Sequence, residues 1–121
     1  MTTTSETLQP GKLIPNWEIK DQEGQKRSLW DYRQKSHVVL LYDPESDAKT
    51  IARWLSAIQA DKKQWDWLNV SFLIAREAPK DVAPGAYAID RYGIFLNRYP
   101  SGKWGFDELE REFLSYEAKH C

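Results

Sequence analysis

Three carboxylates lie at alternate positions just after the most apolar stretch of the chain: Asp43, Glu45 and Asp47. Such a cluster could bind a divalent cation, because ligand sites in α/β proteins lie beyond the carboxyl ends of parallel strands. The neighbouring residues favour a structural role, since Asp43-Pro44 is a turn sequence and Asp47 or Ser46 precedes a helical pattern as an N-cap would. Mg²⁺ and Ca²⁺ need more oxygen ligands than these three residues supply. The sequence therefore predicts no metal site and no cofactor, with Asp47 as a helix cap.

Thiol and imidazole groups are scarce. Cys121 is the only cysteine and the last residue, so it forms no internal disulfide, and two histidines cannot complete a zinc site with it. His120 and Cys121 adjoin at the C-terminus, where the held geometry of a Cys–His nucleophile is not expected. His37 directly precedes a strand and is predicted to be exposed.

The overall composition is that of one globular domain. The chain has 121 residues, 41% of them hydrophobic, and its 17 basic and 18 acidic side chains nearly cancel. Charge-driven binding to nucleic acid or to an anionic membrane is not expected. Residues 1–9 are polar and predict a flexible tail before a single domain over residues 10–121. The longest apolar run is too short for a membrane helix, and with no secretory signal we expect a cytoplasmic protein.

A central β-α-β unit would position the carboxylates. Val38 to Tyr42 is apolar on both faces and predicts a buried strand. Ile51, Trp54, Leu55 and Ile58 then recur at helical spacing and predict one helix from about residue 47 to 63. Residues 70–75 form the next buried strand, which should run parallel to the first.

Three further patterns complete the expected fold. Residues 17–29 alternate around a turn at residues 21–24 and predict an N-terminal hairpin. Residues 86–89 and 94–98 flank Asp90-Arg91-Tyr92-Gly93 and predict a second hairpin. Leu109, Phe113 and Tyr116 predict a C-terminal helix capped by Asp107, whereas residues 76–85 contain two prolines and predict a loop.

This order, with several short motifs, resembles the redoxin and peroxiredoxin branch of the thioredoxin-fold superfamily. The matching segments are a Gly-x-x-x-Pro opening at Gly11–Pro15, a D-x-x-G turn at Asp21–Gly24, a Ser28-Leu29 helix start, the strand 38–42 and the Ile-Asp-x-x-Gly hairpin at Ile89–Gly93. The resemblance implies a thioredoxin-like α/β fold: a mixed sheet with an N-terminal hairpin, a reduced helix set and a C-terminal helix.

The departures from that family concern its chemistry. The positions that match the family's Cys-x-x-Cys hold Asp47 and Thr50, neither of which can exchange disulfides or reduce a peroxide. Pro84 stands where the family keeps a cis-proline, although Ala83-Pro84-Gly85 fits a trans turn equally well. The loop at residues 76–85 replaces a helix of the family, so one face of the sheet near residues 70–75 should lose its cover.

Six tryptophans and six tyrosines are many for a chain of this length. Most should pack in the core, but Trp65, Trp67 and Phe72 are candidate interface residues, because exposed aromatic side chains are enriched where proteins bind one another. The sequence favours a protein without redox chemistry that binds a protein partner or forms a homodimer through this face. Two alternatives stay open: a redoxin-type oxidoreductase with a non-standard site acting through Cys121, and a small-molecule binder at the former active-site end.

Overall fold

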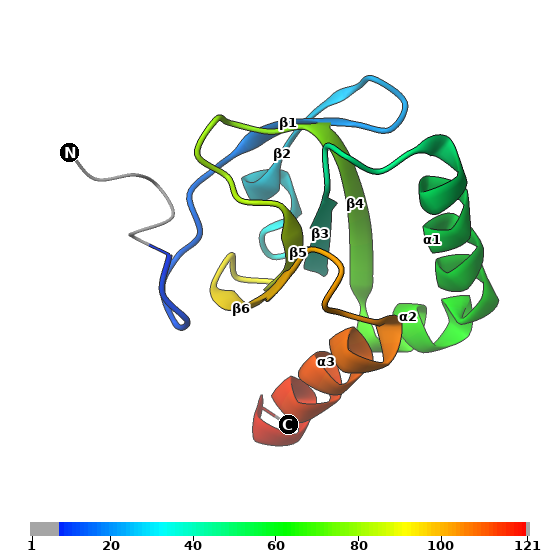
Figure 1. The fold of residues 1–121 in the computed structure, drawn as a ribbon. Coiled ribbons are helices and arrows are strands. Elements are labelled where there is room, and N and C mark those ends of the chain that lie inside the picture. Colours follow the sequence, from blue (N-terminus) through cyan, green and yellow to red (C-terminus); the bar gives the residue numbers. More distant parts are fainter. Residues whose placement is uncertain (1–7, 121) are drawn as a thin grey trace.

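The structure is a computed structural model that describes residues 8–120, and it is built around one six-stranded mixed sheet (Figure 1). The strands lie in the order β2-β1-β4-β3-β5-β6. The elements, in chain order, are β1 (Glu18–Asp21), β2 (Lys26–Ser28), a 3-10 helix (Leu29–Tyr32), β3 (His37–Tyr42), α1 (Ala48–Ala60), α2 (Lys62–Leu68), β4 (Val70–Glu77), β5 (Gly85–Ile89), β6 (Phe95–Pro100) and α3 (Phe106–His120). The predicted mixed sheet, both hairpins and the C-terminal helix are confirmed.

The central strand β3 is the most buried part of the molecule. Leu40 pairs with Leu73 on parallel β4 and with Tyr87 on antiparallel β5, and is fully buried. Because residues alternate between the two faces of a strand, β3 contributes to two separate cores. The predicted parallel β-α-β unit is therefore present.

All three α-helices cover the same face of the sheet. Val39 and Leu41 pack there with Ile51 of α1, Trp65 of α2 and Phe113 of α3. The opposite face has no long helix among the described residues. Loops and the 3-10 helix bury it instead, through Ile14, Trp17, Leu29 and Val82.

The burial of this face by loops corrects the prediction that one face of the sheet near residues 70–75 loses its cover. The helix between β4 and β5 is absent as expected, but Val82 of the connecting loop is buried and Ala78 packs against the core beside it. Trp65 and Phe72 belong to the other, helix-covered face. The missing helix therefore does not expose them.

Two helix boundaries also differ from the prediction. The helix expected over residues 47–63 stops at Ala60, and after the non-helical Asp61 (ψ 27°) the chain forms α2. This second helix ends at Leu68 and is followed by Asn69, which caps it in the left-handed region with φ 60°. Trp65 and Trp67, beyond the end of the predicted helix, thus lie on a helix of their own. α3 begins at Phe106, one residue before Asp107, so Asp107 lies in its first turn instead of capping it.

His37 is buried, not exposed as predicted. Its Nδ1 accepts the backbone N–H of Arg91 at 2.9 Å, which leaves Nε2 to donate to Glu117 Oε2 at 3.2 Å. The ring packs against Phe113 and Tyr116 of α3. A strand start resembles an exposed position in sequence, but α3 crosses it in space.

Residues 1–7 of the predicted tail and Cys121 lie outside the described residues. Leu8, which the prediction also placed in the tail, packs against the loop-covered core. Within the part of the chain that the structure describes, no helix is both long and apolar enough to span a bilayer.

Candidate functional site

The carboxyl end of β3 is where the resemblance places thiol chemistry, and a network of hydrogen bonds holds it. Asp43 accepts the hydroxyl of Ser101 at 2.6 Å and the backbone N–H of Glu45 at 3.0 Å through its two carboxylate oxygens. The Ser46 hydroxyl donates to the Asp43 carbonyl at 2.7 Å. The Asp43 carboxylate therefore orders this turn and ties it to the segment after β6.

Asp47 caps α1, as predicted. Its carboxylate accepts the backbone N–H of Thr50 at 2.8 Å, which satisfies one of the helix's free donors. This hydrogen bond is the main reason that the pKa of Asp47 is lowered, with the Thr50 hydroxyl as a second cause. Asp47 and Thr50, which the resemblance places at the family's cysteine positions, are thus bonded to each other in a cap.

Pro84 lies beside this turn, because Gly85 pairs with Tyr42 at the end of β3. All peptide bonds of the described residues are trans, so of the two alternatives left open by the sequence the structure has the trans turn. The Pro84 carbonyl accepts Arg98 Nη2 at 3.1 Å. Gly85 is required here: its φ is 154°, and a Cβ would come within 2.5 Å of the Tyr99 carbonyl oxygen.

A second region has the opposite character: an apolar groove of about 230 Å³ between β4 and the helices α1 and α2. Figure 1 shows these helices beside β4, on the side away from β5 and β6. Most of the side chains that line the groove are apolar, and they come from four segments: Gln22, Leu55, Ile58, Gln59, Lys62, Trp65, Asp66, Val70, Phe72 and Ile74.

The groove is open because β1 ends early. Asp21 closes the turn after β1 by accepting the backbone N–H groups of Glu23 and Gln25, each at 2.9 Å, and Arg27 Nε at 3.1 Å. These hydrogen bonds to the charged form lower the pKa of Asp21, although its burial opposes them. With the chain turned back at this point, β1 pairs with β4 only at Ala75 and Glu77.

Aromatic rings pack against one another at the floor of the groove. Trp65 and Phe72 meet edge to face with centroids 4.9 Å apart, and Phe72 continues to Phe106 at 5.9 Å. Contacts of this geometry add to the free energy gained by burial alone. Of the three predicted interface residues, Trp65 and Phe72 line the groove, whereas Trp67 does not and is 70% exposed.

Leu55 is the groove residue that sequence reasoning misplaced. Its spacing with Ile51 and Ile58 assigns it to the buried face of the helix, yet 43% of it is exposed. Leu55 lines the groove beside the stretch of β4 that β1 does not reach, and the helical pattern alone gives no signal of this exposure.

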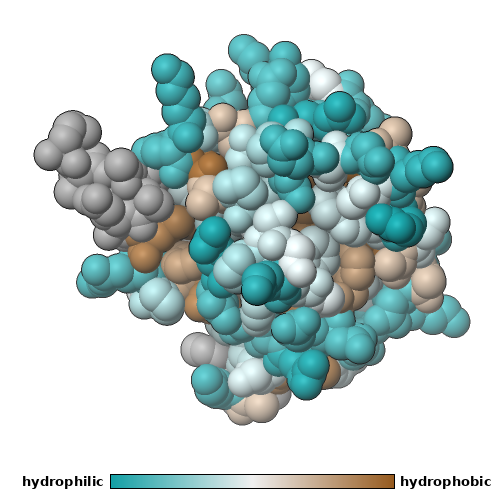
Figure 2. Space-filling model, in the orientation of Figure 1, coloured by the Kyte–Doolittle hydropathy of each residue, from teal (hydrophilic) through white to brown (hydrophobic). Residues whose placement is uncertain are grey.

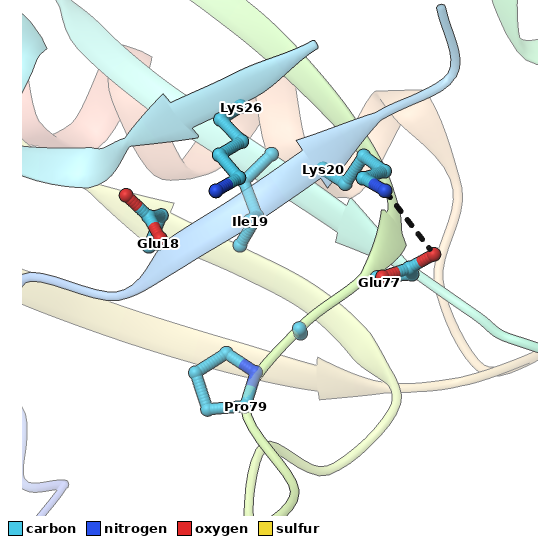
Figure 3. A pocket seen from close by; sticks show the side chains of 7 residues that line it. Glu18, Ile19, Lys20, Lys26, Glu77 and Pro79 are labelled. Atoms are coloured by element: carbon cyan, nitrogen blue, oxygen red, sulfur yellow. Dashed lines mark ion pairs between the residues drawn. The ribbon is translucent and has the colours of Figure 1, made fainter. Parts of the chain in front are cut away.

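A third depression, of about 360 Å³, lies between the β1–β2 hairpin and the loop after β4 (Figure 3). Charged side chains of both signs line it, and Lys20 pairs with Glu77 at 3.8 Å. Figure 2 shows that hydrophilic residues cover most of the face in view, with small hydrophobic patches between them. Among the described residues, no three His, Cys, Asp or Glu side chains are grouped to hold a metal ion.

No family model matches the sequence, and no curated protein sequence matches it either. Solved structures do match. The mitochondrial 2-Cys peroxiredoxin of Plasmodium falciparum is 12% identical with a TM-score of 0.67, covering 90% of this chain and 94% of its own. Peroxidoxin BcpB of Mycobacterium tuberculosis is also 12% identical with a TM-score of 0.67, covering 89% and 97%.

A thioredoxin-type structure matches as well. The thioredoxin domain of a thiol-disulfide oxidoreductase from Bacteroides vulgatus is 14% identical with a TM-score of 0.58, covering 91% of this chain and 99% of its own. Together these likenesses show a thioredoxin-like α/β fold, as the sequence motifs predict. The chain has a single cysteine, Cys121.

Proposed function

We propose that this protein acts by binding another protein through the β4–α1–α2 groove, without thiol chemistry. The observation that carries the proposal is the pairing of Asp47 with Thr50, the two positions that match the family's cysteines. A carboxylate and a hydroxyl joined in a helix cap supply neither a nucleophilic thiolate nor a resolving thiol.

The groove supports binding as the remaining activity. Its walls are mainly apolar, its floor is held by packed aromatic rings, and Leu55 at its wall is partly open to solvent. Tryptophan is among the residue types that contribute most to protein–protein binding when they lie in a well-packed pocket, and Trp65 lines this groove. The proposed partner is another protein or, in a homodimer, a second copy of this chain bound through the same groove.

A small-molecule site near Pro84 is the second candidate. A pocket of about 290 Å³ lies there, with the Tyr87 ring and the Arg98 side chain among its lining residues. The Tyr87 hydroxyl donates to the Ala83 carbonyl, and the Arg98 guanidinium lies 6.0 Å from the centre of the Tyr87 ring. A cation beside an aromatic ring would suit a small aromatic carboxylate, whose binding would raise the melting temperature of the protein.

Reductase and peroxidase assays test the main proposal. The purified protein is given hydrogen peroxide or insulin disulfides with dithiothreitol, beside the Cys121→Ser variant. We expect both proteins to match the rate without protein. Turnover that disappears in Cys121→Ser would instead establish an oxidoreductase acting through the C-terminal thiol.

Sedimentation over a range of concentrations tests self-association. A dimer that is weakened by Leu55→Glu and kept by Leu114→Glu would assign the groove to a second copy. Leu114 is the matched control, since it is exposed to a similar degree (38% against 43%) but lies on α3 outside the groove.

A further inference from the structure

Among the described residues, no strand pairs with the outer side of β4 beside the groove. The carbonyl oxygen of Asn69 accepts the backbone N–H of His37, so the backbone groups of Asn69, Ser71 and Leu73 face β3. Backbone groups alternate in direction along a strand, and those of Val70 and Phe72 must therefore face outward. Within residues 8–120, neither has a strand beside it there, since β1 reaches only Ala75 and Glu77.

The same two residues point their side chains into the groove. Val70 and Phe72 pack on the helix-covered face and line the groove together with Trp65. A chain laid along this edge would thus meet hydrogen-bonding groups and an apolar cavity at once. The cavity, at about 230 Å³, suits one or two aliphatic side chains and is too small for the surface of a folded domain.

This edge also lacks the features that keep other strand edges from pairing. β2 is three residues long and carries Lys26 and Arg27, and β6 carries Arg98 and Pro100. Short length, charge and proline all disfavour the addition of a strand. The stretch Val70-Ser71-Phe72-Leu73 has no charge and no proline.

The charges at the groove favour an uncharged occupant. Lys62 and Asp66, which line it from α2, pair with each other at 2.6 Å. Gln22 and Gln59 are neutral. With its one cation and one anion already matched, the groove offers no excess charge to an acidic or basic segment.

We infer that the groove binds an extended, uncharged segment of another protein, which adds as a strand to the outer edge of β4 at Val70 and Phe72 and places alternate aliphatic side chains against Leu55 and Trp65. This rests on the proposed binding function and specifies its partner. Strand addition takes affinity from backbone hydrogen bonds and specificity from pockets for every second side chain.

The test uses the full-length protein and an acetylated, amidated heptapeptide of sequence SVTLTVS, which alternates aliphatic and polar residues. On titration to millimolar peptide we expect the amide resonances of Val70 and Phe72 to shift and their hydrogen exchange to slow. The amides of Ser71 and Leu73, already bonded to β3, should change less. A peptide of the same composition with its three aliphatic residues adjacent should bind about tenfold more weakly.

Two variants locate the binding. Leu55→Glu should weaken the heptapeptide about tenfold or more, whereas the matched Leu114→Glu should bind it like the wild type. N-methylation of the peptide backbone on one edge should abolish binding, and methylation on the other edge should not, because only one edge of an added strand meets β4.

Three results would overturn the inference: no response at Val70 and Phe72, a response elsewhere on the surface, or equal tolerance of both methylated peptides. Concentration-dependent protection of these amides without peptide would also overturn it, by assigning the edge to a second copy. Peroxide turnover would refute the proposed function and leave the edge result unaffected, so the two failures are distinguishable.

Discussion

The turn after β3 and the groove beside β4 are contrasting regions of one sheet. In the turn, the carboxylates of Asp43 and Asp47 accept hydrogen bonds from neighbouring hydroxyl and backbone groups. In the groove, apolar side chains line a cavity, and no strand of residues 8–120 lies beside the outer backbone groups of Val70 and Phe72. Ligand binding at a polar turn whose hydrogen bonds are already made gains little free energy. Binding at an apolar cavity next to an unpaired strand edge gains free energy both from apolar burial and from new hydrogen bonds.

The largest expected effect is on the floor of the groove. Trp65→Ala should lower the free energy of unfolding by about 3–5 kcal/mol, because it removes a buried indole. Trp67→Ala, two residues along the same helix but 70% exposed, should change it by no more than about 0.5 kcal/mol. Urea denaturation of the two variants measures the difference. Equal losses would show that Trp67 is also structural.

Trp65→Phe refines that result. The indole N–H of Trp65 is buried and has no hydrogen-bond acceptor among the described residues. Phenylalanine keeps a ring against Phe72 and removes only the unpaired donor and part of the volume. It should retain most of the stability lost in Trp65→Ala, and a loss as large as that of alanine would indicate a partner for the N–H.

Mild acid should lower the free energy of unfolding through His37, at the amino end of β3, and not through the turn or the groove. Burial lowers the pKa of His37 below 6.5, although the hydrogen bond to Glu117 opposes this shift. Arg91 lowers it further, Asp90 raises it, and Phe113 and Tyr116 enclose the ring. Because the pKa of His37 is lower in the folded protein, the unfolded chain binds the proton more tightly. The free energy of unfolding should therefore be unaffected by His37 above pH 6.5 and should decline as the pH falls below that value.

Urea midpoints at pH 7.5 and 5.5 measure this decline. His120→Gln should preserve it, and His37→Gln should reduce it. A decline that His120→Gln removes would assign the pH dependence to the other histidine.

A cysteine placed in the turn tests whether the start of α1 can still lower the pKa of a thiol. In Asp47→Cys, made with Cys121→Ser, the new thiol lies at the start of α1, where the helix dipole and free N–H groups stabilise a thiolate. We expect its pKa to be about one unit below the usual ~8.5. The pH dependence of alkylation by iodoacetamide reports the pKa of the new thiol. An unshifted pKa would show that nearby carboxylates offset the stabilisation of the thiolate by the helix.

The smallest effect concerns the cap itself. Asp47→Ala should lower the urea midpoint slightly at pH 7, and Asp47→Asn should lower it less, because an amide oxygen still accepts from Thr50. The pKa of Asp47 is lowered by folding, so its contribution is present above the unfolded value of 3.8 and is lost as the pH falls through the folded one. A difference between wild type and Asp47→Ala that persists at pH 2 would argue against a charged cap.

Local patterns were sufficient for much of the fold. The run at residues 38–42, the hairpin around Asp90-Arg91-Tyr92-Gly93 and the cap at Asp47 depend on residues close in the sequence, and each is present in the structure. The absence of a thiol at positions 47 and 50 is likewise a property of the sequence alone. These features follow from residue types and their spacing, which can be read from the sequence without knowing the tertiary structure.

Tertiary structure decided the rest, because burial and strand pairing depend on residues distant in the chain. α3 buries His37 across 80 positions of sequence, through Glu117. Asp21 holds the turn that ends β1, so β1 pairs with β4 only at Ala75 and Glu77, and Leu55 of α1 is partly exposed beside the stretch of β4 that β1 does not reach. A helical pattern shows that Leu55 lies on the apolar face, but only the neighbouring strand determines whether that face is covered.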